Sequence, residues 1–119
     1  MEAKALADAE IQLTLLGEAV ASANVGFLVW DEDRHYIAAN ACACELLGCT
    51  LEQLLGSVVG GRTPDGDEEV DRVVHHEGGR GEVVVRRYDT DEPIRLGYAT
   101  FVTRTASLPF MASIIWQIE

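Results

Sequence analysis

Short runs of β-prone residues separated by turn residues are the feature that most constrains this fold. Two such runs, "GFLVWD" and "HYIAAN", stand on either side of the polar "DEDR", which predicts a β-hairpin. Three more end the chain, "EVVVRRYD", "IRLGYATFVT" and "PFMASIIWQI", with turn residues between them at 89–93 and 106–109. Strands joined by such short turns predict an antiparallel sheet, because each parallel pair needs a long crossover.

The segment between the two groups of strands carries the signals of short, capped helices. Asn40 stands at the N-terminal cap of a helix over 41–47, and Gly48 stands where that helix should end. "TLEQ", from Thr50, has the pattern of a capping box and predicts a second short helix that ends at Gly56. The fold class is therefore α+β.

A third helix is expected in "GGRTPDGDEEVDRVVHHEGG", where acidic residues come first and two histidines come last. Acids near the N-terminus of a helix and cationic groups near its C-terminus are favoured by the helix dipole. At 100° per residue, Val70, Val73 and Val74 share one apolar face of this helix.

The N-terminal segment, residues 1–23, is predicted to be one amphipathic helix, because from Ala3 onward Gly17 is its only helix-breaking residue. Residues 24–119 form the second predicted unit. Apolar residues in the helix are spaced alternately by three and four positions, which predicts a homodimer through a coiled-coil seam that includes Leu6, Leu13, Leu16 and Val20. The alternative is that Ile11 and Leu15 dock the helix on the sheet of the same chain.

Charge and composition limit the possible partners. The chain has 119 residues, and its 9 Lys and Arg against 20 Asp and Glu give a net charge of -11. Such a charge repels phosphate backbones and anionic lipid, so we expect neither direct nucleic-acid binding nor membrane binding. Acids near the N-terminus and the lack of a long apolar run favour a cytoplasmic protein. The three cysteines are then expected to be reduced thiols.

The stretch "DEDRHYIAANACACELLGCTLEQLLG" resembles PAS domains, the cytoplasmic sensor modules of signalling proteins. In that family an Asp opens the hairpin turn, an Asn ends the second strand nine positions later, and a Leu-Leu-Gly closes the first helix. Asp31, Asn40 and Leu46 to Gly48 match these positions. The turn glycine that the family favours is Arg34 here, so the turn type is expected to differ.

The resemblance extends from about residue 15 to Glu119. It implies a PAS-like five-stranded antiparallel sheet, with short helices on one face over a small cavity and a flanking N-terminal helix. The candidate residues for a ligand pocket come from the third helix and the last strands; they are Val70, Val73, Val74, Tyr98, Ile114 and Trp116. Which face of the sheet lines the pocket stays open, because both faces of the last strand are apolar.

Metal and cofactor sites find little support in the sequence. Cys42 and Cys44 point about 200° apart on a helix, so they cannot bind one metal from a single surface. The resemblance implies that a haem ligand, if there is one, comes from the third helix, which makes His76 the candidate, although it is displaced from the apolar face. Flavin photochemistry is disfavoured, because "GSVVGGRTPDG" lacks the reactive cysteine that the light-sensing branch uses.

The sequence therefore predicts a non-enzymatic sensory and dimerisation module of a signal-transduction protein, of histidine kinase or transcriptional regulator type. A small apolar ligand in its core is the accompanying expectation, and the ligand and output partner stay open. One alternative is a haem-binding gas sensor. The other is a small α+β enzyme of cyclase or isomerase type, in which Glu77 would be a buried proton acceptor.

Overall fold

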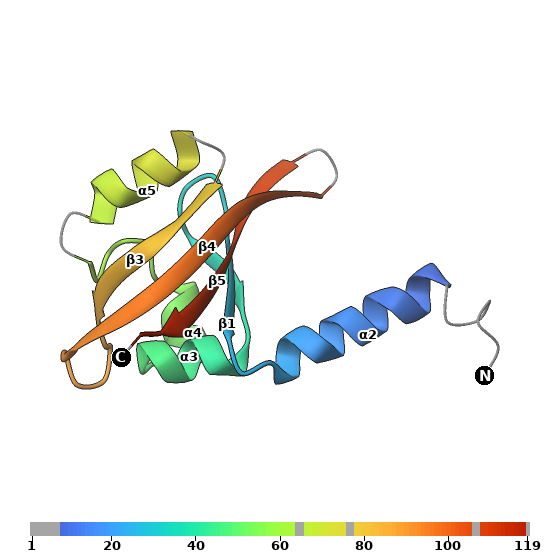
Figure 1. The fold of residues 1–119 in the computed structure, drawn as a ribbon, viewed down its shortest axis with the longest axis horizontal. Coiled ribbons are helices and arrows are strands. Elements are labelled where there is room, and N and C mark those ends of the chain that lie inside the picture. The colour runs from blue at the N-terminus through green and yellow to red at the C-terminus, as the bar shows by residue number, and fades with distance from the viewer. Residues whose placement is uncertain (1–7, 64–65, 76–77, 106–107, 119) are drawn as a thin grey trace.

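The computed structural model describes residues 8–63, 66–75, 78–105 and 108–118. They form a single sheet with flanking helices (Figure 1). In chain order the elements are α2 (Ala9–Ser22), β1 (Gly26–Trp30), β2 (Tyr36–Ala39), α3 (Ala41–Leu47), α4 (Leu51–Leu55), α5 (Gly66–His75), β3 (Gly78–Arg86), β4 (Pro93–Thr105) and β5 (Leu108–Gln117).

The five strands form an antiparallel sheet in the order β2-β1-β5-β4-β3, which confirms the predicted architecture. The first and last strands are therefore neighbours in the middle of the sheet, where Gly26 pairs with Ile115. β3 begins earlier than the sequence predicts, because Gly78 already pairs with Phe101 of β4. Gly78 does so at a φ of 138°, which residues with a side chain rarely adopt.

The hydrophobic core lies between the sheet and helices α3, α4 and α5. Side chains of a strand alternate between the two faces of the sheet, and Met111, Ser113 and Ile115 of β5 are on the buried face. Strands β1 and β4 and the three helices contribute the rest of the core. Its buried apolar residues are Leu28, Trp30, Ala43, Leu47, Leu54, Val70, Val73, Ile94, Leu96, Tyr98, Met111 and Ile115.

The two short helices begin and end as predicted. Thr50 and Gln53 form a complete capping box at the start of α4. At the start of α3, the side-chain oxygen of Asn40 accepts from the backbone N–H of Ala43 at 3.1 Å and also from that of Phe27 at 2.9 Å. Gly48 ends α3 in the left-handed conformation, with φ 72°.

The hairpin turn between β1 and β2 shows what replaces the glycine of the family pattern. Arg34 adopts a φ of 67°, so a residue with a side chain occupies the left-handed region. Its guanidinium forms an ion pair with Asp71 of α5. The turn is thereby connected to the helix that covers the sheet.

Helix α2 extends away from the sheet, as the blue helix in Figure 1 shows. Asp8 caps it, and none of its residues is buried. Leu15 is 49% exposed, so the helix does not rest on the sheet of its own chain, as the docking alternative would require. The first part of the predicted helix, with Leu6, lies outside the described residues. Among the helices that the structure describes, none is long and apolar enough to cross a membrane.

Candidate ligand-binding cavity

A small cavity of about 100 Å³ lies between α5 and the inner face of the sheet. The loop that precedes α5 closes it on one side, through Val59, Gly60 and Thr63. Seven of its sixteen lining residues are aliphatic, and they are Leu28, Val59, Val70, Val73, Val83, Val85 and Ile115. Sites for drug-sized ligands have volumes of about 300–1,000 Å³, so this cavity suits a smaller molecule.

Three of the six predicted pocket residues line this cavity: Val70, Val73 and Tyr98. Val74 does not, and its side chain is 44% exposed. It lies at the far end of α5, beside a separate surface hollow shared with Val102 and Met111. Val74 is on the same face of α5 as Val70 and Val73, but along the helix axis it lies past the end of the cavity.

Ile114 and Trp116 do not line this cavity, because they lie on the opposite face of β5. Ser113 and Ile115 line the cavity instead. Trp116 is 37% exposed on the outer face, where it is paired with Gly97 of β4. A Cβ at Gly97 would come within 2.4 Å of the indole, so only glycine leaves room for this ring.

Three polar side chains on neighbouring strands are hydrogen-bonded in a row where the sheet lines the cavity. The indole N–H of Trp30 donates to Ser113 Oγ at 3.3 Å, and this hydroxyl is 2.8 Å from Thr100 Oγ1. Buried hydroxyls are costly without a partner, and here each has one. Ser113 was not predicted as a pocket residue, although a serine within "MASII" is a recognisable polar interruption of an apolar strand.

A second polar group joins α5 to β4 where α5 covers the sheet. The Tyr98 hydroxyl donates to the Glu69 carboxylate. Arg72 Nη2 donates to Glu69 Oε1 at 2.6 Å and to the Tyr98 hydroxyl at 3.2 Å. Burial and then the bond to Glu69 raise the pKa of Tyr98. Glu69 lines the cavity and Arg72 does not, and neither was singled out from the sequence.

Tyr36 completes the polar lining from β2. Burial, followed by the neighbouring Tyr88 and Cys49, raises the pKa of Tyr36 far above the usual range for a phenol. The phenol is therefore neutral at physiological pH.

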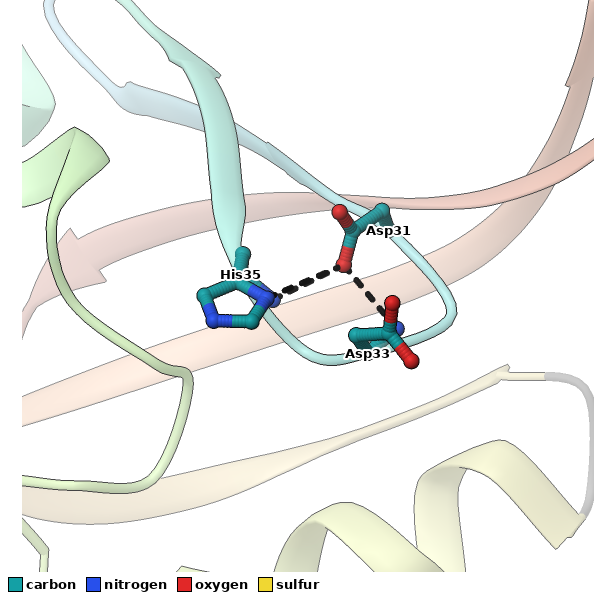
Figure 2. Close-up of side chains that lie close together, drawn as sticks. All are labelled: Asp31, Asp33 and His35. Carbon is teal, nitrogen blue, oxygen red and sulfur yellow. Dashed lines mark hydrogen bonds and ion pairs between the residues drawn. The ribbon is translucent and has the colours of Figure 1, made fainter.

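Asp31, Asp33 and His35 form a cluster in the β1–β2 turn (Figure 2). Their potential ligand atoms lie within 4.8 Å of one another. Asp31 Oδ1 already accepts the backbone N–H groups of Asp33 and His35, both at 2.9 Å. This carboxylate therefore serves the turn itself, and the other two side chains are exposed.

Two candidates from the sequence lie outside the described residues. They are His76, the candidate haem ligand, and Glu77, the candidate proton acceptor of the enzyme alternative.

Comparison with known proteins agrees with this geometry. A family model described as the PAS fold matches residues 20–90, and the chain belongs to this family. It is thus a PAS domain, a member of a family of sensory signalling modules that are generally not enzymes. No curated protein matches the chain significantly.

Several solved PAS-domain structures are similar along most of the chain. One, from a two-component sensor histidine kinase, has 10% identity and a TM-score of 0.80, and the match covers 93% of this chain and 100% of that chain. A domain of a sensory box sensor histidine kinase/response regulator from Geobacter sulfurreducens has 16% identity and a TM-score of 0.78, covering 92% and 97%. The PAS domain of an HTR-like protein from Haloarcula marismortui has 16% identity and a TM-score of 0.77, covering 92% and 93%. At these identities the likeness concerns the fold.

Proposed function

We propose that this PAS domain is a non-enzymatic sensor that binds a small, mainly apolar molecule in the cavity beneath α5. The observation that carries the proposal is the cavity itself, with its aliphatic lining and a few convergent polar groups. Its volume of about 100 Å³ favours a ligand of few heavy atoms and favours neither haem nor flavin. The histidine kinases among the similar structures support a place in a signal-transduction protein of that type or of the transcriptional regulator type.

The polar contacts indicate how ligand binding would change the conformation of the domain. The hydrogen bonds of Tyr98 with Glu69 and Arg72 join α5 to β4. A ligand with one hydrogen-bonding group would compete for Tyr98 and change the position of α5. The signal would therefore leave the domain through this helix and the turn that Arg34 connects to it.

The enzyme alternative has less support. Glu69 is the one acid lining the cavity within the part of the chain that the structure describes. Tyr98 donates to its carboxylate, and Arg72 forms an ion pair with it, so a proton acceptor role would require both contacts to be broken. Tyr36 and Tyr98 are the other acid–base side chains in the described lining, and burial raises the pKa of both, so neither is suited to exchange a proton near neutral pH.

We also propose that the domain forms a homodimer through α2. Leu13 and Leu16 are 70% and 61% exposed, so this helix presents an apolar stripe that no other described part of the chain covers. A second copy of the same helix suits this stripe, because the spacing by three and four residues is that of a coiled-coil seam.

The ligand proposal can be tested with tryptophan fluorescence, since Trp30 lines the cavity and Trp116 lies outside it. The Trp116→Phe variant leaves Trp30 as the sole tryptophan. Titration of this variant with short-chain and aromatic alcohols should give a saturable change in emission. Native mass spectrometry of the purified full chain should reveal any retained molecule.

A matched pair of variants provides the control. Val73→Phe fills the cavity and should abolish the saturable response, whereas Val74→Phe adds the same ring outside the cavity and should preserve it. If no probe gives a saturable response and no molecule is retained, the cavity is a packing defect and the domain is an interaction module.

A further inference from the structure

Cys44 and Cys49 are brought together by the way helix α3 ends. Gly48, in the left-handed conformation, reverses the chain, and the backbone N–H of Cys49 then donates to the carbonyl oxygen of Cys44 at 3.0 Å. In glycine caps of this kind, the residue after the glycine characteristically contacts the residue four positions before the glycine. Here both of these positions are cysteines.

The backbone hydrogen bond sets a limit on the separation of the two residues. With standard bond lengths, it keeps the two Cα atoms within about 6.9 Å, and bending at either atom brings them closer. Disulfide-bonded cysteines have Cα atoms about 4.4–6.8 Å apart. The backbone of this cap therefore holds the two Cα atoms no farther apart than about the upper end of the range that a disulfide spans.

The side chains also lie near each other. The Cys44 thiol is among the neighbours that raise the pKa of Cys49, and both cysteines are half-buried against the core. Cys42 lies two residues before Cys44, on the opposite side of α3, and faces a surface hollow together with Glu45 and Arg87. Of the three cysteines, Cys44 and Cys49 are the pair that this geometry places together.

We propose that Cys44 and Cys49 are a redox-sensitive pair that forms an intramolecular disulfide across the α3 cap when the protein meets a disulfide oxidant. The corner that this bond would close is also held by the β3–β4 hairpin. Arg87 donates to the carbonyl oxygens of Glu45 and Leu46 at 3.1 and 3.2 Å. The backbone N–H of Tyr88 donates to the carbonyl oxygen of Leu47 at 2.9 Å. Oxidation would therefore rigidify the C-terminal end of α3, to which the β3–β4 hairpin is hydrogen-bonded.

With oxidised glutathione the reaction balances in two exchange steps. One protein thiolate attacks a glutathione sulfur, which breaks the glutathione disulfide, forms a mixed disulfide and releases one glutathione thiolate. The second protein thiolate then attacks the protein sulfur of the mixed disulfide and releases the second glutathione. The protein loses two protons, which the two released thiolates take up. Two thiols are oxidised and one glutathione disulfide is reduced to two glutathione molecules.

The rate should depend on pH, since the thiolate is the reactive species. Burial first and then the Cys44 thiol raise the pKa of Cys49 to about 11. The disulfide should therefore form slowly at neutral pH and faster as the solution becomes more alkaline.

The test uses the full chain with Cys42→Ser, which removes the third thiol and leaves the proposed pair. The reduced protein is incubated with oxidised glutathione, the remaining thiols are blocked with N-ethylmaleimide, and the mass is measured. We expect a loss of two hydrogens and no blocked thiol. Proteolysis after Glu45 separates the two cysteines in sequence, so the fragments should stay joined until a reductant is added.

Two comparisons make the result specific. Cys44→Ser and Cys49→Ser, each with Cys42 intact, should form no intramolecular disulfide at a comparable rate. In a glutathione buffer at equilibrium, the ratio of disulfide to dithiol should be at least tenfold higher for the folded Cys42→Ser protein than for the same protein in denaturant, where the cap is absent. The proposal is overturned if the folded Cys42→Ser protein keeps two free thiols, stops at glutathione adducts, forms only intermolecular disulfides, or reaches no higher ratio of disulfide to dithiol at equilibrium than the denatured chain.

Discussion

The side-chain amide nitrogen of Asn40 lies 2.7 Å from the carbonyl oxygen of Val20 and donates a hydrogen bond to it. The same nitrogen donates to the carbonyl oxygen of Val25 at 3.0 Å. Because the oxygen of this side chain caps α3 and accepts from Phe27, one buried amide joins the last turns of α2, the start of β1 and the start of α3. Asn40 thus connects the proposed dimerisation helix to the sensor core.

Replacement of Asn40 by Asp tests this junction. The carboxylate can still accept from Phe27 and Ala43, but it cannot donate to Val20 or Val25. The Val20 oxygen still accepts from the backbone N–H of Ala23 at 3.3 Å, whereas the Val25 oxygen loses this donor. A buried carbonyl oxygen that loses its partner costs about 1–3 kcal/mol, so Asn40→Asp should lower the free energy of unfolding by about 1–3 kcal/mol in urea titrations. Asn24→Asp, the same change at an exposed position nearby, is the control. Equal stability of the two variants would contradict the role assigned to Asn40.

Arg34 permits a separation of backbone strain from side-chain pairing. Arg34→Ala keeps the left-handed φ of 67° and loses the pair with Asp71, whereas Arg34→Gly loses the pair and relieves the backbone. A left-handed residue with a Cβ costs about 1–2 kcal/mol, so the glycine variant should be the more stable of the two by about 1 kcal/mol in urea unfolding. Equal stabilities would mean that the turn relaxes to another conformation in the alanine variant.

The proposed dimer depends on the exposed leucines of α2. Leu13→Glu combined with Leu16→Glu should convert the dimer to a monomer in light scattering at tens of micromolar, because like charges would then face each other across the seam. Gln12→Glu combined with Glu18→Gln, on exposed positions outside the seam, preserves the net charge and should leave the mass unchanged. A wild-type chain that is monomeric at this concentration would contradict the proposal.

Tyr36 should make the fold sensitive to alkali. In the unfolded chain this phenol loses its proton near pH 10, whereas in the folded chain burial keeps the proton on to higher pH. The unfolded state then binds fewer protons, so the free energy of unfolding should fall as the pH rises above about 10, by at most about 1.4 kcal/mol per pH unit for this group.

Tyr36→Phe removes the titrating group and should reduce this slope, as measured by urea unfolding at a series of pH values between about 9 and 12. Comparing slopes rather than absolute stabilities separates titration from the loss of the hydroxyl itself. An unchanged slope would assign the alkaline sensitivity to other groups, such as Tyr98 and Cys49.

Local signals in the sequence predicted the short elements well. The cap at Asn40, the left-handed Gly48 and the capping box at Thr50 act through contacts within a few residues, so their outcome does not depend on distant packing. The five strands followed from β-propensity and turn residues, and the resemblance to PAS domains correctly implied the antiparallel sheet.

The pocket was harder to predict, because it depends on which elements face each other. Both parities of β5 are apolar, and the choice between Ile114 and Ile115 is made only when the helices cover one face of the sheet. The contact of Glu69 and Arg72 with Tyr98 joins residues that are distant in sequence, and no local pattern indicates it. Val74 has a suitable helical angle, but its position past the cavity is a property of how α5 is placed on the sheet.

The pairing of β1 with β5 has a mechanical consequence. The strands are antiparallel, and Gly26, at the start of β1, is opposite Ile115, near the end of β5. A tension applied between the segments that flank these two residues would pull at one end of the strand pair and load its hydrogen bonds one after another. A strand pair pulled in this way separates at low force, because its hydrogen bonds break one after another. Strands pulled along their length share the load among all their hydrogen bonds.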